Sequence, residues 1–191
     1  MTELQKIERV KILCDPALDV KIRKDIVNNL SGAVFSHQGK YLWLGTDELV
    51  AIERFTRLEN SPGLFGEHQR FYLKNSIDGF DEQQGEVDVE GLDYSDGYLW
   101  VIGSHSSKRK KVEIEADKFK IEGKELKKVV RQENRYLLAR IPINEAGELD
   151  NKSAQRGWLS RDGSSNSLTK ALATDEYLDF AQTIERNDRS S

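Results

Sequence analysis

Short apolar runs, each closed by a polar turn, divide the first half of the chain into strand-sized pieces. Residues 30–35 and 41–45 predict a hairpin, and 48–55 and 70–73 predict a third and a fourth strand. Each run is bounded by Gly, Pro or Asn, the residue types that most often end strands. The pattern therefore predicts a four-stranded antiparallel unit.

The first hairpin of this unit occurs twice. Residues 30–34 and 41–46 read LSGAV and YLWLGT, and residues 89–94 and 98–104 read VEGLDY and YLWVIGS. The period is 91 − 32 = 59 residues at the glycine and 100 − 43 = 57 residues at the tryptophan. Hairpin repeats of this length are typical of β-propellers. Trp43 and Trp100 are then expected to be mostly buried, between neighbouring blades.

The second unit differs from the first in where its third strand begins. An apolar run resumes only at residues 136–143, so residues 106–134 are interpreted as an insertion at a blade loop. Helical spacing appears at 167–172 and 177–184. These boundaries predict an N-terminal extension with an outer strand (1–29), propeller blades (30–145), a helical and loop region (146–185) and a disordered tail (186–191).

The fold expected from these patterns is mainly all-β, a partial β-propeller of roughly two to three blades with an inserted basic segment and a short C-terminal helical region. At this period 191 residues hold at most three units, whereas closed propellers usually have four to eight blades. Open strand edges favour pairing with another chain. We therefore expect possible self-association through the open blades.

Composition and charge narrow the class of protein. The chain has 37% hydrophobic residues and no apolar run long enough for a membrane helix. Its N-terminus has no secretory signal pattern, and its one cysteine, Cys14, excludes an intrachain disulfide. A cytoplasmic protein without membrane contact is the expected class.

The formal net charge of −4 hides two opposed segments. Residues 76–96 carry eight acidic residues and no Lys or Arg, whereas residues 106–135 carry eleven basic against six acidic residues. The basic segment could bind phosphate or an acidic partner, or it could simply be a solvated surface. Phe119 is its only aromatic residue, which argues against nucleic acid.

Polar residues beside the repeated strands are the candidates for chemistry. A divalent cation such as calcium or magnesium could be held by Glu90, Asp47 and Glu48 together with His105. Alternatively, Glu90 accepts hydrogen bonds from backbone N–H groups and so joins neighbouring blades. His105, between two serines, could be a general base or a hydrogen-bonded turn residue. His37 and His68 are assigned to polar loops. The ligand-binding set expected at the channel mouth is Glu90, Gly91, Ser104, His105 and Arg109.

Three segments carry a resemblance to a known family: EGL at 90–92, GSHS at 103–106 and KRK at 108–110. Through them the chain resembles a bacterial family known as domain of unknown function 3616 over about residues 30–180. The resemblance implies a β-propeller related to the esterase-like phytase and strictosidine-synthase-type propellers. It implies no settled activity for the family.

Two functions from different classes are compatible with these patterns. The first is a propeller-type binding protein that recognises a small anionic ligand or a protein partner. The alternative is a metal-assisted phosphoester or lactone hydrolase with its site at the channel mouth, where a bound cation would activate water.

Overall fold

The computed structural model describes residues 9–61, 63–109, 129–130, 132–163 and 165–175. The chain forms two main β-sheets with few helices, as the mainly all-β prediction expected. None of the helices in these described ranges is long and apolar enough to cross a membrane.

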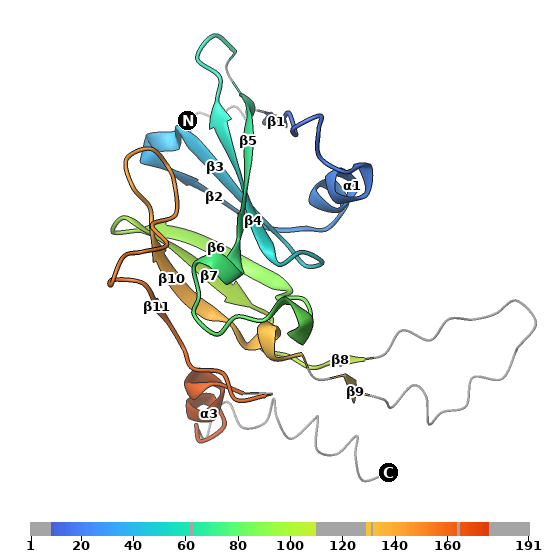
Figure 1. Cartoon of the computed structure of the whole chain (residues 1–191), viewed down its shortest axis with the longest axis vertical. Helices are drawn as coiled ribbons and strands as arrows, with labels where there is room; N and C mark the ends of the chain where they lie inside the picture. The colour runs from blue at the N-terminus through green and yellow to red at the C-terminus, as the bar shows by residue number, and fades with distance from the viewer. Residues whose placement is uncertain (1–8, 62, 110–128, 131, 164, 176–191) are drawn as a thin grey trace, which may run out of the picture.

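The first sheet has five strands in the order β1-β5-β4-β3-β2. Four of them form an antiparallel meander: β2 (Leu30–Ser36), β3 (Tyr41–Thr46), β4 (Ala51–Arg57) and β5 (Leu64–Tyr72). Strand β1 (Lys11–Ile12) adds to β5 in parallel, and the helix α1 (Val20–Asn28) follows it. The N-terminal residues therefore extend and cover the first meander (Figure 1).

The second sheet repeats this meander with strands β6 (Val89–Ser95), β7 (Tyr98–Gly103), β10 (Leu138–Pro142) and β11 (Gly157–Trp158). A two-stranded ribbon, β8 (Lys108–Arg109) with β9 (Val129–Val130), extends from it. The described residues also form the short helices η1 (His37–Gly39), η2 (Leu73–Asn75), η3 (Glu82–Gln84) and η4 (Glu133–Tyr136), and α3 (Ser167–Leu172).

The two meanders match residue by residue. In the first, the pairing register skips Ser31, and in the second it skips Glu90, so both inner strands carry a β-bulge at the same place. In the next strand pair, Trp43 lies opposite Arg54 and Trp100 lies opposite Arg140. The sequence repeat is therefore also a repeat of strand register.

The meanders pack through their inner strands, with β2 against β6. A Cβ at Gly32 would lie 3.3 Å from Leu92 Cγ, and one at Gly45 would lie 2.6 Å from Val89 Cγ1. Glycine at these positions permits the close approach. One hydrophobic core, which includes Trp43, fills the space between the two sheets.

A second core lies on the opposite face of the first sheet. Ile26 of α1 packs there with Leu42, Leu44, Phe55 and Phe65. Helix α1 begins at Asp19, whose side chain accepts a hydrogen bond from the Lys21 N–H at 2.7 Å. Both faces of the first sheet are therefore covered, and β3 is buried along its whole length.

The two repeated tryptophans differ in burial. Trp43 is 0% exposed and its Nε1 donates to Ser36 Oγ at 2.9 Å. Trp100 is only partly buried and belongs to neither hydrophobic core of the described residues, so it meets the expectation of burial less fully than Trp43 does. The reason is that Trp100 lies on the face of the second sheet turned away from the first.

Several boundaries also differ from those predicted. The fourth strand begins at Leu64, not at residue 70, so His68 lies in a strand and not in a loop. Asn134, the last residue of the predicted insertion, is buried in η4 and belongs to the fold itself. The rest of the predicted insertion at 110–128 and 131, and the predictions at 177–184 and 186–191, lie outside the described residues.

Candidate functional site

The residues singled out from the sequence lie at the ends of matching strands. Glu90 is exposed in the bulge of β6, and Gly91 follows it. Ser104 and His105 follow β7, as Asp47 and Glu48 follow β3. Arg109 lies in β8, opposite Val129. The strand repeat therefore places Ser104 and Asp47 at equivalent positions.

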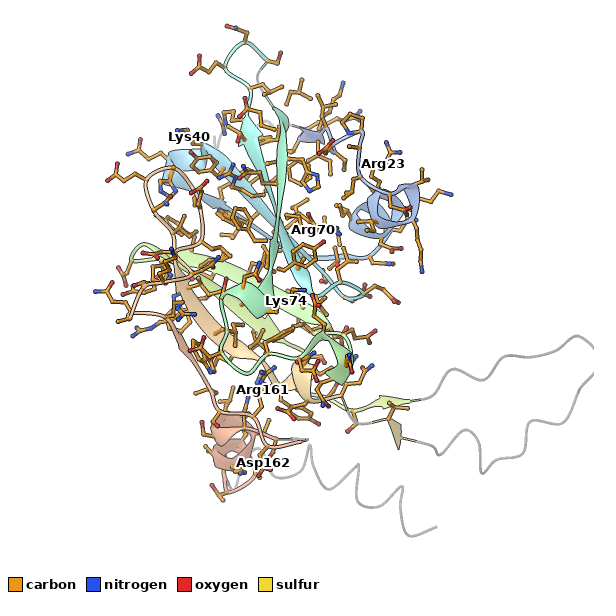
Figure 2. All side chains as sticks on the ribbon, viewed as in Figure 1. Arg23, Lys40, Arg70, Lys74, Arg161 and Asp162 are labelled. Atoms are coloured by element: carbon orange, nitrogen blue, oxygen red, sulfur yellow. The ribbon has the colours of Figure 1, made fainter. Side chains whose placement is uncertain are left out.

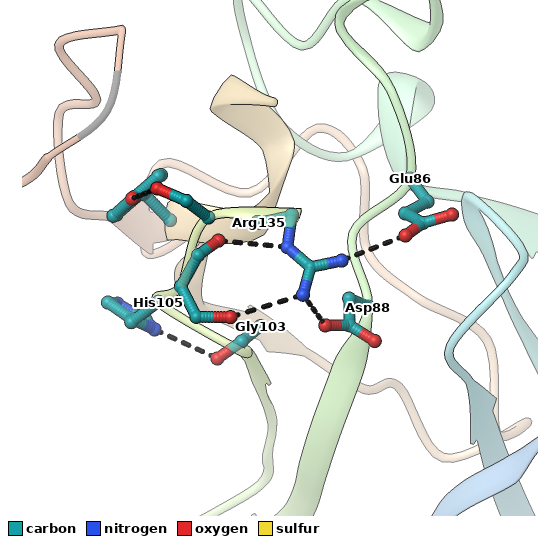
Figure 3. Close-up of polar contacts among 8 residues, drawn as sticks. Glu86, Asp88, Gly103, His105 and Arg135 are labelled. Carbon is teal, nitrogen blue, oxygen red and sulfur yellow. Dashed lines mark hydrogen bonds and ion pairs between the residues drawn. The ribbon is translucent and has the colours of Figure 1, made fainter. Parts of the chain in front are cut away.

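His105 is fixed by hydrogen bonds at both ring nitrogens. Its Nδ1 lies 2.8 Å from the Gly103 carbonyl oxygen (Figure 3). Its Nε2 lies 2.8 Å from Asn166 Nδ2. A carbonyl can only accept and an amide NH₂ can only donate, so Nδ1 carries the proton and Nε2 accepts. His105 is thus held as the neutral tautomer with its lone pair in use.

Asn166, the partner of His105, is itself fixed. It is 0% exposed, and its Oδ1 accepts from the Thr169 N–H at 2.9 Å, which caps α3. Its Nδ2 also donates to the Tyr136 carbonyl at 2.6 Å. A general base needs a free lone pair, so His105 would have to break the Asn166 bond to act as one. The geometry gives His105 a structural role in this state.

Arg135 forms the centre of the neighbouring polar cluster in Figure 3. It pairs with Glu86 at 2.8 Å and also with Asp88. Its Nε donates to the Ser106 carbonyl at 2.9 Å, and its Nη2 donates to Ser106 Oγ at 3.1 Å. Two carboxylates balance one buried guanidinium, so this cation is not available to an external anion. The cluster joins the chain before β6 to the chain after β7.

Unpaired polar atoms lie at the ends of β3 and β7. Thr46 Oγ1, Asp47 Oδ1 and Ser104 Oγ are buried and have no hydrogen-bond partner among the described residues. However, nowhere in the described ranges do three or more His, Cys, Asp or Glu side chains lie together so that they could hold a metal ion. The cation site suggested at Glu90, Asp47 and Glu48 therefore stays a prediction without an assembled ligand set.

A buried ionic cluster on the first sheet escaped the sequence analysis. Glu53 is 0% exposed, and its carboxylate accepts from Arg70 Nε at 2.8 Å and pairs with His68 Nε2 at 2.7 Å. The Asp15 N–H donates to His68 Nδ1 at 3.3 Å, so Nε2 carries the proton toward Glu53. Arg70 lies on the side of the sheet that α1 covers (Figure 2). This cluster attaches the N-terminal segment to the sheet.

The signal for this cluster was the strand register. Glu53 lies directly opposite Arg70 on β4 and β5, a cross-strand charge pair whose members both lie in the predicted strands. His68 joins this pair only once the fourth strand is extended back to Leu64. Burial, followed by the charge of Glu53, raises the pKa of the nearby Cys14 thiol. Cys14 is thus less reactive than an ordinary thiol, and the cluster has no activated nucleophile.

A second unexpected feature is the outer face of the second sheet. We define the Trp100 face as the side chains of Asp93, Tyr98, Trp100, Ile102, Leu138 and Arg140, which cross-strand pairing places on one side of β6, β7 and β10. The Arg140 guanidinium lies 5.0 Å from the Tyr98 ring centroid and 5.9 Å from that of Trp100. Its four large apolar side chains belong to neither hydrophobic core.

The first sheet has the same arrangement in a covered form. Arg54 lies 4.8 Å from the Tyr41 ring centroid and 5.7 Å from that of Phe71. Its Nη1 donates to the carbonyls of Ala146 at 3.1 Å and Gly147 at 2.6 Å, in the turn that follows β10. Burial lowers the pKa of Arg54. The Trp100 face thus repeats the surface of the first sheet that the second meander covers, and no described element packs over it in the same way.

Comparison with known proteins agrees with the resemblance noted in the sequence. A family model described as "Protein of unknown function (DUF3616)" matches residues 29–189. No curated protein and no solved structure matches the chain.

Proposed function

The chain belongs to the DUF3616 family of proteins of unknown function, and from this premise we propose that it is a propeller-type binding protein that recognises a protein partner through the Trp100 face. The observation that carries the proposal is the repeat of the Tyr41, Trp43 and Arg54 surface by Tyr98, Trp100 and Arg140. The first of these surfaces is a packed interface, and the second is uncovered in the described part of the chain.

The propeller architecture is supported by the strand arrangement. Two four-stranded antiparallel meanders with the same bulge lie with their inner strands side by side. Adjacent propeller blades pack in this way, face against face around a common axis. In such an array each blade has one face for the preceding unit and one for the next.

A binding role fits the polar groups better than catalysis does. His105 has both ring nitrogens occupied, and Arg135 is balanced by two carboxylates. By contrast, the Trp100 face combines aromatic rings with an arginine, the side chains most enriched in protein interfaces. A protein partner is therefore favoured over a small anion.

The proposal can be tested by photo-crosslinking in the producing cell. Benzoylphenylalanine at Leu138, on the Trp100 face, should give one discrete crosslinked protein product. The same label at Tyr72, 41% exposed on the first sheet, is the matched control. A product from both positions, or from neither, would contradict the proposal, and so would a Leu138 product that persists in Trp100→Ser.

One observation favours metal-assisted hydrolysis as a second candidate. Asp47 Oδ1 is buried without a hydrogen-bond partner in the described chain, as a carboxylate oxygen reserved for a cation would be. Calorimetric titration with Ca²⁺, Mg²⁺ and Mn²⁺, with a screen of phosphoesters and lactones, tests this candidate. Turnover that Glu90→Gln or Asp47→Asn abolishes would replace the binding proposal, and absence of both heat and turnover would exclude the hydrolase.

A further inference from the structure

The Trp100 face has a charge pattern that is complementary to itself. Asp93, Trp100 and Arg140 form one row across β6, β7 and β10, because Asp93 and Arg140 each lie directly opposite Trp100. The two charged residues are two strand spacings apart, ~10 Å. The row thus runs from acidic, through aromatic, to basic.

Neither charged residue of the row is neutralised within the described chain. Both Asp93 and Arg140 are exposed, and neither forms a salt bridge with any described residue. Arg140 contacts only the Tyr98 and Trp100 rings among its charged or aromatic neighbours. In the first sheet the equivalent Arg54 is buried and donates to carbonyl oxygens of the unit packed on it. The guanidinium N–H groups of Arg140 therefore have no hydrogen-bond acceptor among the described residues.

From this pattern we propose that the Trp100 face binds the Trp100 face of a second copy of the chain in a twofold-symmetric dimer. A twofold axis that passes over Trp100, parallel to the strands and in the plane of contact, would reverse the row and set Asp93 of each copy opposite Arg140 of the other. The aromatic and aliphatic side chains would lie between these pairs. Twofold interfaces are formed by the same patch on both copies and must be self-complementary. The inference rests on the proposed binding function and names its partner.

A head-to-tail arrangement of copies is blocked by surfaces that are already covered. In the first meander, the Trp43 surface packs on the face of the second sheet that carries Leu99 and Val101. The first sheet has a face equivalent to this Leu99 and Val101 face. It carries Leu42 and Leu44, and Ile26 of α1 covers it. In the part of the chain that the structure describes, a second copy therefore has neither of these two faces free, and it can meet the Trp100 face through its own Trp100 face.

Charge reversal separates this dimer from other forms of association. Asp93→Arg gives a face with two basic groups, and Arg140→Asp gives a face with two acidic groups. Each variant alone should raise the dimer dissociation constant ~10-fold or more, because like charges then meet across the axis. An equimolar mixture of the two variants should form a heterodimer at least as readily as the unmodified chain, since both contacts then join opposite charges.

The measurement is sedimentation equilibrium of the full chain at low and at moderate salt. Glu59→Arg, an exposed charge reversal in a turn of the first sheet, is the matched control and should leave the dimer unchanged. Trp100→Ser should give a monomer. All of these substitutions are at exposed or half-buried positions, and a circular dichroism melt verifies that each variant is folded.

Three results would overturn the inference. The unmodified chain could be monomeric up to about 100 μM, the two single variants could dimerise as the unmodified chain does, or their mixture could remain monomeric. A monomeric chain that still gives a Leu138 crosslink to a protein of different mass would refute the dimer but retain the binding function. Loss of that crosslink as well would refute both.

Discussion

Gly147, in the turn that follows β10, packs against Tyr41 of the first meander. It has φ +73°, and a Cβ there would lie 2.5 Å from Cζ of the Tyr41 ring. Its carbonyl also accepts the hydrogen bond from Arg54. We therefore predict that Gly147→Ala destabilises the fold by forcing the two sheets apart.

The magnitude has two parts. An alanine in the left-handed region costs ~1–2 kcal/mol, and crowding of a packed interface by one extra carbon costs a further ~1–3 kcal/mol. The expected loss in the free energy of unfolding is thus ~2–5 kcal/mol. This is a large part of the ~5–15 kcal/mol by which a domain of ordinary stability is folded.

Gly79→Ala separates the two parts. Gly79 has φ +71°, but a Cβ there would have no heavy atom within 4 Å, so this variant should lose only the backbone part. Urea unfolding followed by tryptophan fluorescence, with the slope m checked for constancy, measures both. Equal losses for Gly147→Ala and Gly79→Ala would refute the close contact between the turn and Tyr41.

Three further outcomes follow from burial and charge. Trp43→Ala should cost ~3–5 kcal/mol in urea unfolding, and Trp100→Ala less than half of that, since Trp100 is only half-buried; equal costs would contradict the difference in packing. Glu53→Gln should lower stability by ~3–5 kcal/mol, because it leaves Arg70 without its buried counter-charge, and an unchanged melting temperature would be evidence against the cluster. The raised pKa of Cys14 means that the native thiol keeps its proton above the unfolded-chain value of ~8.5, so stability should fall as pH rises through that value; Cys14→Ser should remove this fall, and its persistence would show another origin.

The repeated hairpins could be predicted because their signals are local. A glycine, a polar turn and a central tryptophan recur at fixed offsets, and the strands 30–36 with 41–46 and 89–95 with 98–103 follow these signals within a residue. The helix at 167–172 was visible from the helical spacing of its residues, and α3 has the same bounds. The coarse fold class needed no more than these.

The features that escaped prediction depend on contacts distant in sequence. α1 buries only Ile26, too little for an apolar period to appear. The environment of His105 depends on Asn166, 61 residues further along the chain, so its ring nitrogens could not be assigned from the neighbouring serines. Trp100 and Trp43 have nearly the same local sequence, and only the packing of the sheets decides that Trp43 alone is fully covered.

Arg54 joins the two meanders through hydrogen bonds to main-chain oxygens alone, the carbonyls of Ala146 and Gly147 in the turn that follows β10. Main-chain acceptors are present whatever side chains the turn carries, so mutation can change most of that turn without loss of the bond. The contact then requires only an arginine on one unit and, on the other, a glycine where the turn meets the Tyr41 ring. Two units joined in this way can therefore differ widely in side chains and still assemble, and these two meanders do share a strand register with few identical residues.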